Sequence, residues 1–127
     1  KHEAADVAQK YGVSVISLIA PTSEDRIKMI ASEAEGFIYI VSSMGVTGVR
    51  SEIKTDIGHI MEAVKKYAKV PAAVGFGISK PEQAKKMADL SDGVIVGSAI
   101  VKLVAQYGSD APDHIYEYVK SMKDAIR

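Results

Sequence analysis

Four short apolar runs alternate with longer amphipathic stretches along the chain. The runs are rich in β-branched residues and each is bounded by Gly or Pro on at least one side, a pattern typical of buried strands. They cover residues 13–19, 37–42, 72–76 and 93–97. Between them the apolar residues recur every three or four positions, which predicts helices that each bury one face.

The helical stripes predict amphipathic helices at the start of the chain, after each of the first three runs, and at the end of the chain. The segment Ser98–Gly108, just after the fourth run, is instead apolar nearly all round, so we expect a short and largely buried helix there. The stripes consist of Ala4, Val7, Ala8 and Tyr11; Ile27, Ile30, Ala31 and Ala34; Ile57, Ile60, Met61 and Val64; Ala84, Met87 and Ala88; and Ile115, Tyr118, Val119, Met122 and Ile126.

Two of the predicted helices begin with recognisable signals. Ser23 precedes Glu24, and serine is a good N-cap residue. Ser79 stands three residues before Glu82, with Pro81 in the first turn. This spacing predicts a capping box, in which the two side chains satisfy each other's backbone N–H groups.

The predicted order is one helix, then four strand–helix units, with an extra short helix after the fourth strand. Each helix must carry the chain back to start the next strand in the same direction, which gives an α/β fold with a parallel sheet. Such a sheet can be a small open doubly wound sheet or one half of a (β/α)8 barrel. The length of 127 residues does not decide between them.

The second unit is about a dozen residues longer than the others. The excess lies between Ser42 and Thr55, in a segment that contains Gly45 and Gly48. Loops of this length are uncommon in α/β units and are usually functional. We expect a lid over a binding site, and the alternatives are a flexible surface loop or a loop that contains a short helix.

Composition narrows the classes of function. Lys+Arg and Asp+Glu both number 16, so the formal net charge is zero, and no basic cluster points to nucleic acid. The chain has no cysteine, which removes disulfides and thiolate metal sites and suits a cytoplasmic protein. No apolar run approaches the roughly 20 residues of a membrane span. We therefore expect a globular cytoplasmic protein that binds neither nucleic acid nor membranes.

The chain begins with Lys1 rather than Met, and no N-cap residue precedes its first helical stripe. We expect either a processed start or a fragment of a longer protein.

Parallel α/β folds bind ligands at the carboxyl ends of their strands. There the third and fourth strands are followed by Gly75-Phe76-Gly77 and by Gly97-Ser98. Glycine permits positive φ and lacks the Cβ that would keep a ligand away from the backbone. A helix that starts just beyond presents free N–H groups and partial positive charge. The two junctions therefore predict a site for a phosphate or another anion, with turn glycines of no ligand role as the alternative.

A barrel would place these junctions in a known arrangement. Barrels that bind phosphate commonly use the loops after strands 7 and 8 and the N-terminus of a short extra helix. The helix after Gly97 matches that extra helix if the runs at 72–76 and 93–97 are strands 7 and 8. The first two runs are then strands 5 and 6, and four strands lie upstream of this sequence.

Other side chains give weaker signals. His2, His59 and His114 are scattered over helical segments, which argues against a metal site. The acidic residues stand mostly on helices and none at the carboxyl end of a strand, so no general acid or base is visible. Tyr39, within the second run, and Phe76, between the two glycines, are each either pocket residues or ordinary core residues.

Four motifs stand in a distinctive order and at distinctive distances: "LIAPTSEDRI", "YIVSSMGVTGVR", "VGFGISKPEQ" and "VIVGSAIVK". They resemble the C-terminal half of tryptophan synthase alpha chains, and the resemblance covers essentially the whole chain. It implies that residues 1–127 form the C-terminal half of a single (β/α)8 barrel domain, with roughly strands 5–8 and their helices. It also implies a lyase of tryptophan biosynthesis, which cleaves indole-3-glycerol phosphate to indole and glyceraldehyde 3-phosphate by a retro-aldol reaction.

The resemblance also assigns roles to residues. Thr47 corresponds to the threonine of a mobile loop that closes over the site, Tyr39 to an active-site tyrosine, and Phe76 to a phenylalanine beside the indole ring. The family's catalytic glutamate and aspartate lie in the N-terminal half, so no catalytic residue is assigned to this chain. The backbone groups that bind phosphate in the family carry over to Gly48, Gly77, Gly97 and Ser98.

The resemblance further implies an alpha chain without cofactor or metal, in a heterotetramer with a beta subunit that uses pyridoxal phosphate and receives the indole. Without the carboxylates we expect little activity from this chain alone, since each general acid or base contributes about 10²–10⁴-fold. Four strands also leave two open edges, so we expect association with the missing N-terminal half or with itself. The alternatives are another phosphate-binding barrel enzyme and a non-catalytic half-barrel fragment.

Overall fold

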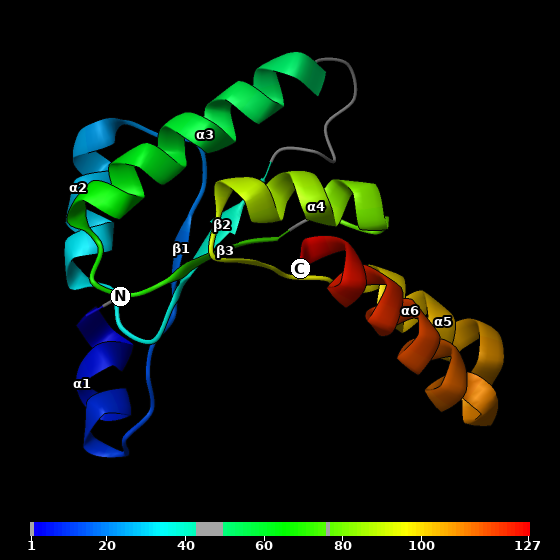
Figure 1. The fold of residues 1–127 in the computed structure, drawn as a ribbon. Coiled ribbons are helices and arrows are strands. Elements are labelled where there is room, and N and C mark those ends of the chain that lie inside the picture. The colour runs from blue at the N-terminus through cyan, green and yellow to red at the C-terminus, as the bar shows by residue number, and fades with distance from the viewer. Residues whose placement is uncertain (1, 43–49, 76) are drawn as a thin grey trace.

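One helix and four strand–helix units follow each other in the predicted order (Figure 1). The structure, a computed structural model, describes residues 2–42, 50–75 and 77–127, without the side chains of residues 2 and 50–56. The strands are β1 (Ser17–Ile19), β2 (Ile38–Val41), β3 (Ala72–Gly75) and β4 (Gly93–Val94). The helices are α1 (His2–Lys10), α2 (Glu24–Glu33), α3 (Arg50–Tyr67), α4 (Pro81–Leu90), α5 (Ser98–Tyr107) and α6 (Ala111–Ile126), with a 3-10 turn, η1 (Gly108–Asp110), before α6.

The four strands run parallel in one sheet, in the order β1-β2-β3-β4, as the sequence predicts. The register aligns Leu18 with Tyr39, Tyr39 with Ala73, and Ala73 with Gly93. Because the strands are parallel, all their carboxyl ends lie at one edge of the sheet, called the carboxyl edge below. Strands β1 and β4 are the outermost strands of the described sheet.

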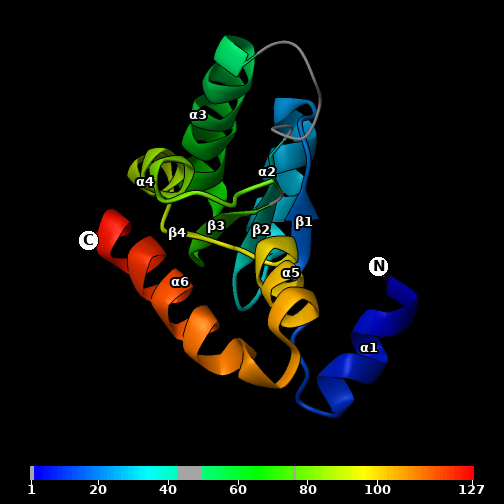
Figure 2. The ribbon, with the colours of Figure 1, turned by 90° about the vertical axis from the view of Figure 1, so that its right-hand side faces the viewer.

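The core lies between one face of the sheet and the helices. Helices α2, α3 and α4 follow one another around this face, as Figures 1 and 2 show, and α6 adds Met122. Burial of each large aliphatic side chain stabilises the fold by about 1.5–3 kcal/mol. The sheet contributes four large, fully buried side chains to this core: Ile19, Ile38, Ile40 and Val74.

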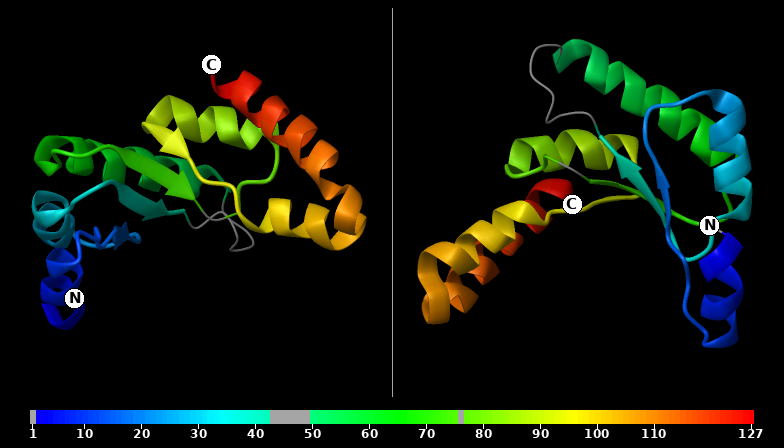
Figure 3. Two further views of the ribbon diagram at one scale, coloured as in Figure 1. Left: turned by 90° about the horizontal axis from the view of Figure 1, so that it is seen from below. Right: turned by 180° about the vertical axis from the view of Figure 1, so that it is seen from behind.

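The opposite face of the sheet, called the open face below, carries the residues that alternate with this core set. Leu18 on this face is 61% exposed, and Tyr39 and Ala73 are half-buried. The views in Figure 3 show that α2, α3 and α4 leave this side of the strands free. The described part of the chain therefore buries one face of its sheet and exposes much of the other.

On the open face, the end of the Tyr39 side chain lies over Gly75. A Cβ placed on Gly75 would collide with the hydroxyl and the neighbouring ring carbons of Tyr39. Gly75 is not among the glycines with positive φ. It is therefore required because it leaves room for the tyrosine, not because of its backbone conformation.

Two sequence predictions are wrong. The segment expected as a loop up to Thr55 is partly helical, since α3 begins at Arg50. The remaining residues 43–49, where we expected a lid, lie outside the described residues. Helix α5 was expected to be largely buried, yet it has no buried residue, and Val101 is 67% exposed. The helix packs on α6, and in the described structure its other apolar sides have little to pack against.

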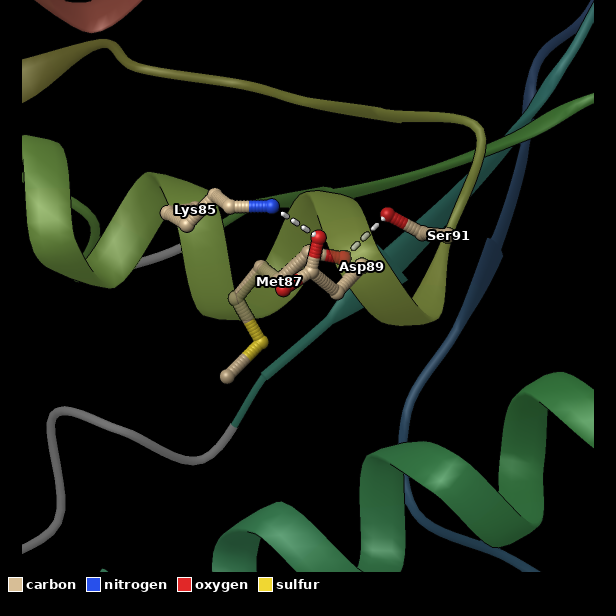
Figure 4. A network of polar contacts seen from close by, with 4 residues as sticks. All are labelled: Lys85, Met87, Asp89 and Ser91. Carbon is tan, nitrogen blue, oxygen red and sulfur yellow. Dashed lines mark hydrogen bonds and ion pairs between the residues drawn. The ribbon is translucent and has the colours of Figure 1, made fainter. Parts of the chain in front are cut away.

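The turn between α4 and β4 is fastened by hydrogen bonds to β3 and to the end of α4. Asp92 Oδ2 accepts from the Ala72 N–H at 2.9 Å, and the Asp92 N–H donates to the Ala72 carbonyl at 3.0 Å. Ser91 Oγ lies 2.7 Å from the Met87 carbonyl, and Figure 4 shows this contact beside the exposed Lys85–Asp89 ion pair of α4. These bonds fix where β4 begins against β3, and so where its carboxyl end lies.

We predict that Gly75→Ala destabilises the chain because the new methyl group collides with Tyr39. The expected loss in the free energy of unfolding is about 1–3 kcal/mol, the usual cost of overpacking. In a Tyr39→Ala background the same substitution should cost much less, which gives a coupling energy of about 1 kcal/mol or more in a double-mutant cycle. Urea unfolding followed by circular dichroism measures all four variants.

Gly58→Ala is the matched control, since a Cβ on this helical glycine would meet nothing within 4 Å. It should be neutral or stabilising by up to about 1 kcal/mol. Equal losses from Gly75→Ala with and without Tyr39 would contradict the contact.

Candidate functional site

The carboxyl edge brings together segments that are distant in the sequence. Ser42 follows β2, Gly77 stands two residues after β3, and Gly97-Ser98 follows β4 and opens α5. Tyr39 reaches toward the same edge, since its side chain lies over the last residue of β3. Thr47, Gly48 and Phe76, which the sequence also assigns to the site, lie outside the described residues.

Ser42 locks the ends of β2 and β3 together. Its N–H and its hydroxyl both donate to the Gly75 carbonyl, each at 3.0 Å, and the residue is 1% exposed. This role of Ser42 was not predicted from the sequence. A serine that ends an apolar run was the available signal, because a buried polar side chain has to find a hydrogen-bond partner.

Gly77 uses the positive φ that glycine permits. Its φ is 78°, in the left-handed region that favours glycine, and the residue is exposed. The next side chain, Ile78, is 3% exposed and belongs to the core. The chain therefore turns at Gly77 and is anchored again one residue later.

The start of α4 differs from the prediction. Lys80 is the N-cap residue rather than Ser79, and Gln83 rather than Glu82 reaches back. Its Oε1 accepts from the Ser79 N–H at 3.0 Å and from the Lys80 N–H at 3.1 Å. These two N–H groups already have an acceptor within the chain, so they are not free to bind a ligand.

The start of α5 is different. Gly97 is its N-cap residue, and no side chain of the described residues caps it. The Gly97 carbonyl accepts from Ile100 and Val101, so the N–H groups of Ser98 and Ala99 precede the first helical acceptor. The first turn of α5 thus leaves N–H donors and the positive end of a helix dipole at the carboxyl edge.

Gly97 needs neither a positive φ nor room for a neighbouring atom at the Cβ position. Its φ is −123°, so it does not use the positive φ that glycine permits. A Cβ on Gly97 would meet nothing within 4 Å in the described structure. Open space next to the backbone at a helix start is an arrangement that lets an anion approach the N–H groups closely.

Tyr118 of α6 reaches the segment after Gly77. Its hydroxyl donates to the Ser79 carbonyl at 2.5 Å. Partial burial raises the pKa of the Tyr118 phenol above its ordinary value. A tyrosine hydroxyl is protonated at neutral pH even without this shift, so it can donate. The sequence placed Tyr118 only in an apolar stripe, because nothing local indicates a partner 39 residues away.

The described residues contain no group of three or more His, Cys, Asp or Glu side chains that could hold a metal ion. His114 instead stacks on Tyr107, with ring centroids 3.5 Å apart. No helix in the described ranges is long and apolar enough to cross a membrane. What the described carboxyl edge offers is backbone N–H groups and the hydroxyls of Ser98 and Tyr39, which can hold a substrate by hydrogen bonds.

A family model described as "Tryptophan synthase alpha chain" matches residues 1–127. The tryptophan synthase alpha chain of Lacticaseibacillus casei is 48% identical over 126 residues, which are 99% of this chain and 47% of that protein. The one from Thermoanaerobacter sp. (strain X514) is 49% identical over 121 residues, 94% of this chain and 46% of that protein. The chain thus spans about half the length of the curated relatives it matches, and corresponds to their C-terminal part.

Solved structures agree with this. The tryptophan synthase subunit alpha from Campylobacter jejuni superposes with a TM-score of 0.76 at 31% identity, over 98% of this chain and 48% of that one. A chain of the tryptophan synthase a2b2 complex from Pyrococcus furiosus gives 0.78 at 33% identity, over 96% and 50%. These neighbours are (β/α)8 barrels, and the four-stranded sheet matches one half of the barrel. Because the family model matches from the first residue to the last, the chain belongs to the tryptophan synthase alpha chain family.

Proposed function

We propose that residues 1–127 are the C-terminal half of a single (β/α)8 domain, and that the complete protein is a lyase. It cleaves indole-3-glycerol phosphate to indole and glyceraldehyde 3-phosphate by a retro-aldol reaction. The family match over the whole chain supports this reaction over that of another phosphate-binding barrel. The exposed open face and the outermost strands β1 and β4 are the surfaces that a barrel would cover.

In this proposal the chain holds the phosphate group of the substrate. The N–H groups of Gly77, Gly97 and Ser98, with the Ser98 hydroxyl, donate to the phosphate oxygens. The α5 dipole favours the negative charge by about 0.3–1 kcal/mol, and by up to about 2 kcal/mol where the site is partly buried. The observation that carries this assignment is Gly97, which opens α5 with open space where a Cβ would stand.

The remaining residues of the site are proposed on the resemblance. Gly48 adds a phosphate donor, Thr47 belongs to the loop that closes over the substrate, and Phe76 lies beside the indole ring. Tyr39 lines the pocket, and its place on the open face supports that role, since this face is the interior of a barrel.

The acid–base chemistry belongs to the other half of the barrel, whose glutamate and aspartate this chain does not contain. The complete alpha chain needs no cofactor or metal of its own. It works with a beta subunit in a cytoplasmic heterotetramer, and the a2b2 complex of the Pyrococcus furiosus relative supports this partner. Within the alpha chain, the partner of these 127 residues is the N-terminal half or, failing that, a second copy.

We predict that the isolated chain does not remain a monomer, because the open face and two strand edges favour pairing. Gel filtration with light scattering should give a mass well above the 13.6 kDa of one chain. Adding the N-terminal half of the Lacticaseibacillus casei relative should convert it to a one-to-one complex. A clean monomer that ignores the added half would contradict this.

We predict that indole forms only when both halves are present. The chain alone lacks the acid and the base, each worth about 10²–10⁴-fold, so its rate should be near the background. The mixture with the N-terminal half should cleave indole-3-glycerol phosphate measurably. Full activity from the 127-residue chain alone would show that the carboxylates do not lie elsewhere.

We predict that Gly97→Ala weakens substrate binding without unfolding the chain. The new Cβ meets no protein atom within 4 Å, so the free energy of unfolding should change by less than about 1 kcal/mol. The methyl group should obstruct the phosphate, which predicts a rise in KM of about tenfold or more in the two-half mixture. Gly58→Ala serves as the control that leaves KM unchanged, and an unchanged KM in Gly97→Ala would refute the assignment.

A further inference from the structure

The hydrogen bond from Tyr118 to Ser79 joins the last helix to the turn after β3. Tyr118 lies on α6, and Ser79 lies two residues beyond Gly77 and just before α4. The bond is 2.5 Å long, and the ring that carries the hydroxyl is partly buried against the core. The bond therefore links the two parts of the proposed phosphate site. Ser79 belongs to the turn that contains Gly77, and α6 follows α5, which begins at Ser98.

The turn at Gly77 is held on both sides. Upstream, Ser42 donates twice to the Gly75 carbonyl. Downstream, Gln83 accepts from the Ser79 N–H, and Tyr118 donates to the Ser79 carbonyl. The anchors thus lie on either side of Gly77, a residue that itself imposes little conformational preference.

Helix α6 is in turn tied to the other part of the site. It follows α5 after the short η1 turn, and the stacking of Tyr107 on His114 holds the two helices together at that turn. Residues of β4, α5 and α6 line a cleft of about 230 Å³, and Tyr118 is one of them. Where apolar packing leaves such a space, a directed hydrogen bond fixes relative position more strictly than side-chain contacts do.

We propose that Tyr118 is a positioning residue of the phosphate site. Through Ser79 it holds the turn at Gly77 at a set distance from the first turn of α5, so that N–H groups from both segments reach one phosphate. This inference rests on the proposed function. Hydrogen-bonding sites need their groups held to within about 0.5 Å, which explains why one bond between α6 and the turn before α4 affects binding.

Tyr118→Phe tests this, since it removes one oxygen and keeps the ring that packs against the core. The probes are inorganic phosphate and glycerol 3-phosphate, titrated into the ¹⁵N-labelled 127-residue chain and followed by the amide signals of Gly77, Gly97 and Ser98. In the wild type these signals should shift together. In Tyr118→Phe the dissociation constant should rise by about 2–10-fold, the usual effect of one hydrogen bond.

Tyr116→Phe is the matched control, because Tyr116 lies on the same helix and is 64% exposed. It should leave the dissociation constant unchanged. If Tyr118→Phe keeps a dispersed spectrum and binds phosphate as tightly as Tyr116→Phe, Tyr118 has only a structural role and the proposal is overturned.

The two-half mixture gives a second readout. A positioning role predicts that Tyr118→Phe raises KM for indole-3-glycerol phosphate while kcat is largely kept, whereas a loss of folded protein lowers the apparent kcat and leaves KM unchanged. If the wild type neither binds the phosphate probes nor becomes active in the mixture, the proposed function itself fails. If the wild type does either and Tyr118→Phe matches it, only the role of Tyr118 fails.

Discussion

Parallel pairing of the four strands is the constraint on which the other features of this chain depend. It requires a crossover between successive strands, and the crossover helices cover one face of the sheet. It also places every carboxyl end at one edge, which brings Ser42, Gly77 and Ser98 together. The same pairing leaves β1 and β4 outermost and the open face exposed. The parallel pairing therefore explains both the position of the candidate site and the exposed surfaces that the other half of a barrel would cover.

The order of elements could be predicted from the sequence because local patterns determine it. Buried runs such as Ile38–Val41 and amphipathic stripes such as that of α3 follow from the spacing of apolar residues alone. The exposure of Val101 could not be predicted. An apolar helix sequence indicates that the helix packs against other segments, but not whether those segments belong to the same chain. The family and its barrel were recognisable from motifs, which carry more information than periodicity.

The contacts that shape the site depend on tertiary geometry. Tyr39 meets Gly75 only because of the register of β2 on β3. Gln83 caps α4 in place of Glu82 because the helix begins one residue later than the serine signal implied. The glycines make the same point. Gly75 leaves room for a side chain, Gly77 adopts positive φ, and Gly97 does neither. The residue type alone does not distinguish these roles. The binding roles stay predictions for every assigned site residue: Tyr39, Thr47, Gly48, Phe76, Gly77, Gly97 and Ser98.

The uncovered sheet face has a consequence for the thermodynamics of unfolding. The heat capacity of unfolding rises with the apolar area that becomes hydrated, at about 12–15 cal/mol/K per residue for closed domains. A chain that leaves Leu18 and its neighbours in water when folded hydrates less new surface on unfolding. Its stability curve is therefore flatter with temperature than that of a closed domain of equal length. Covering that face steepens the curve, so assembly changes how stability depends on temperature as well as its magnitude.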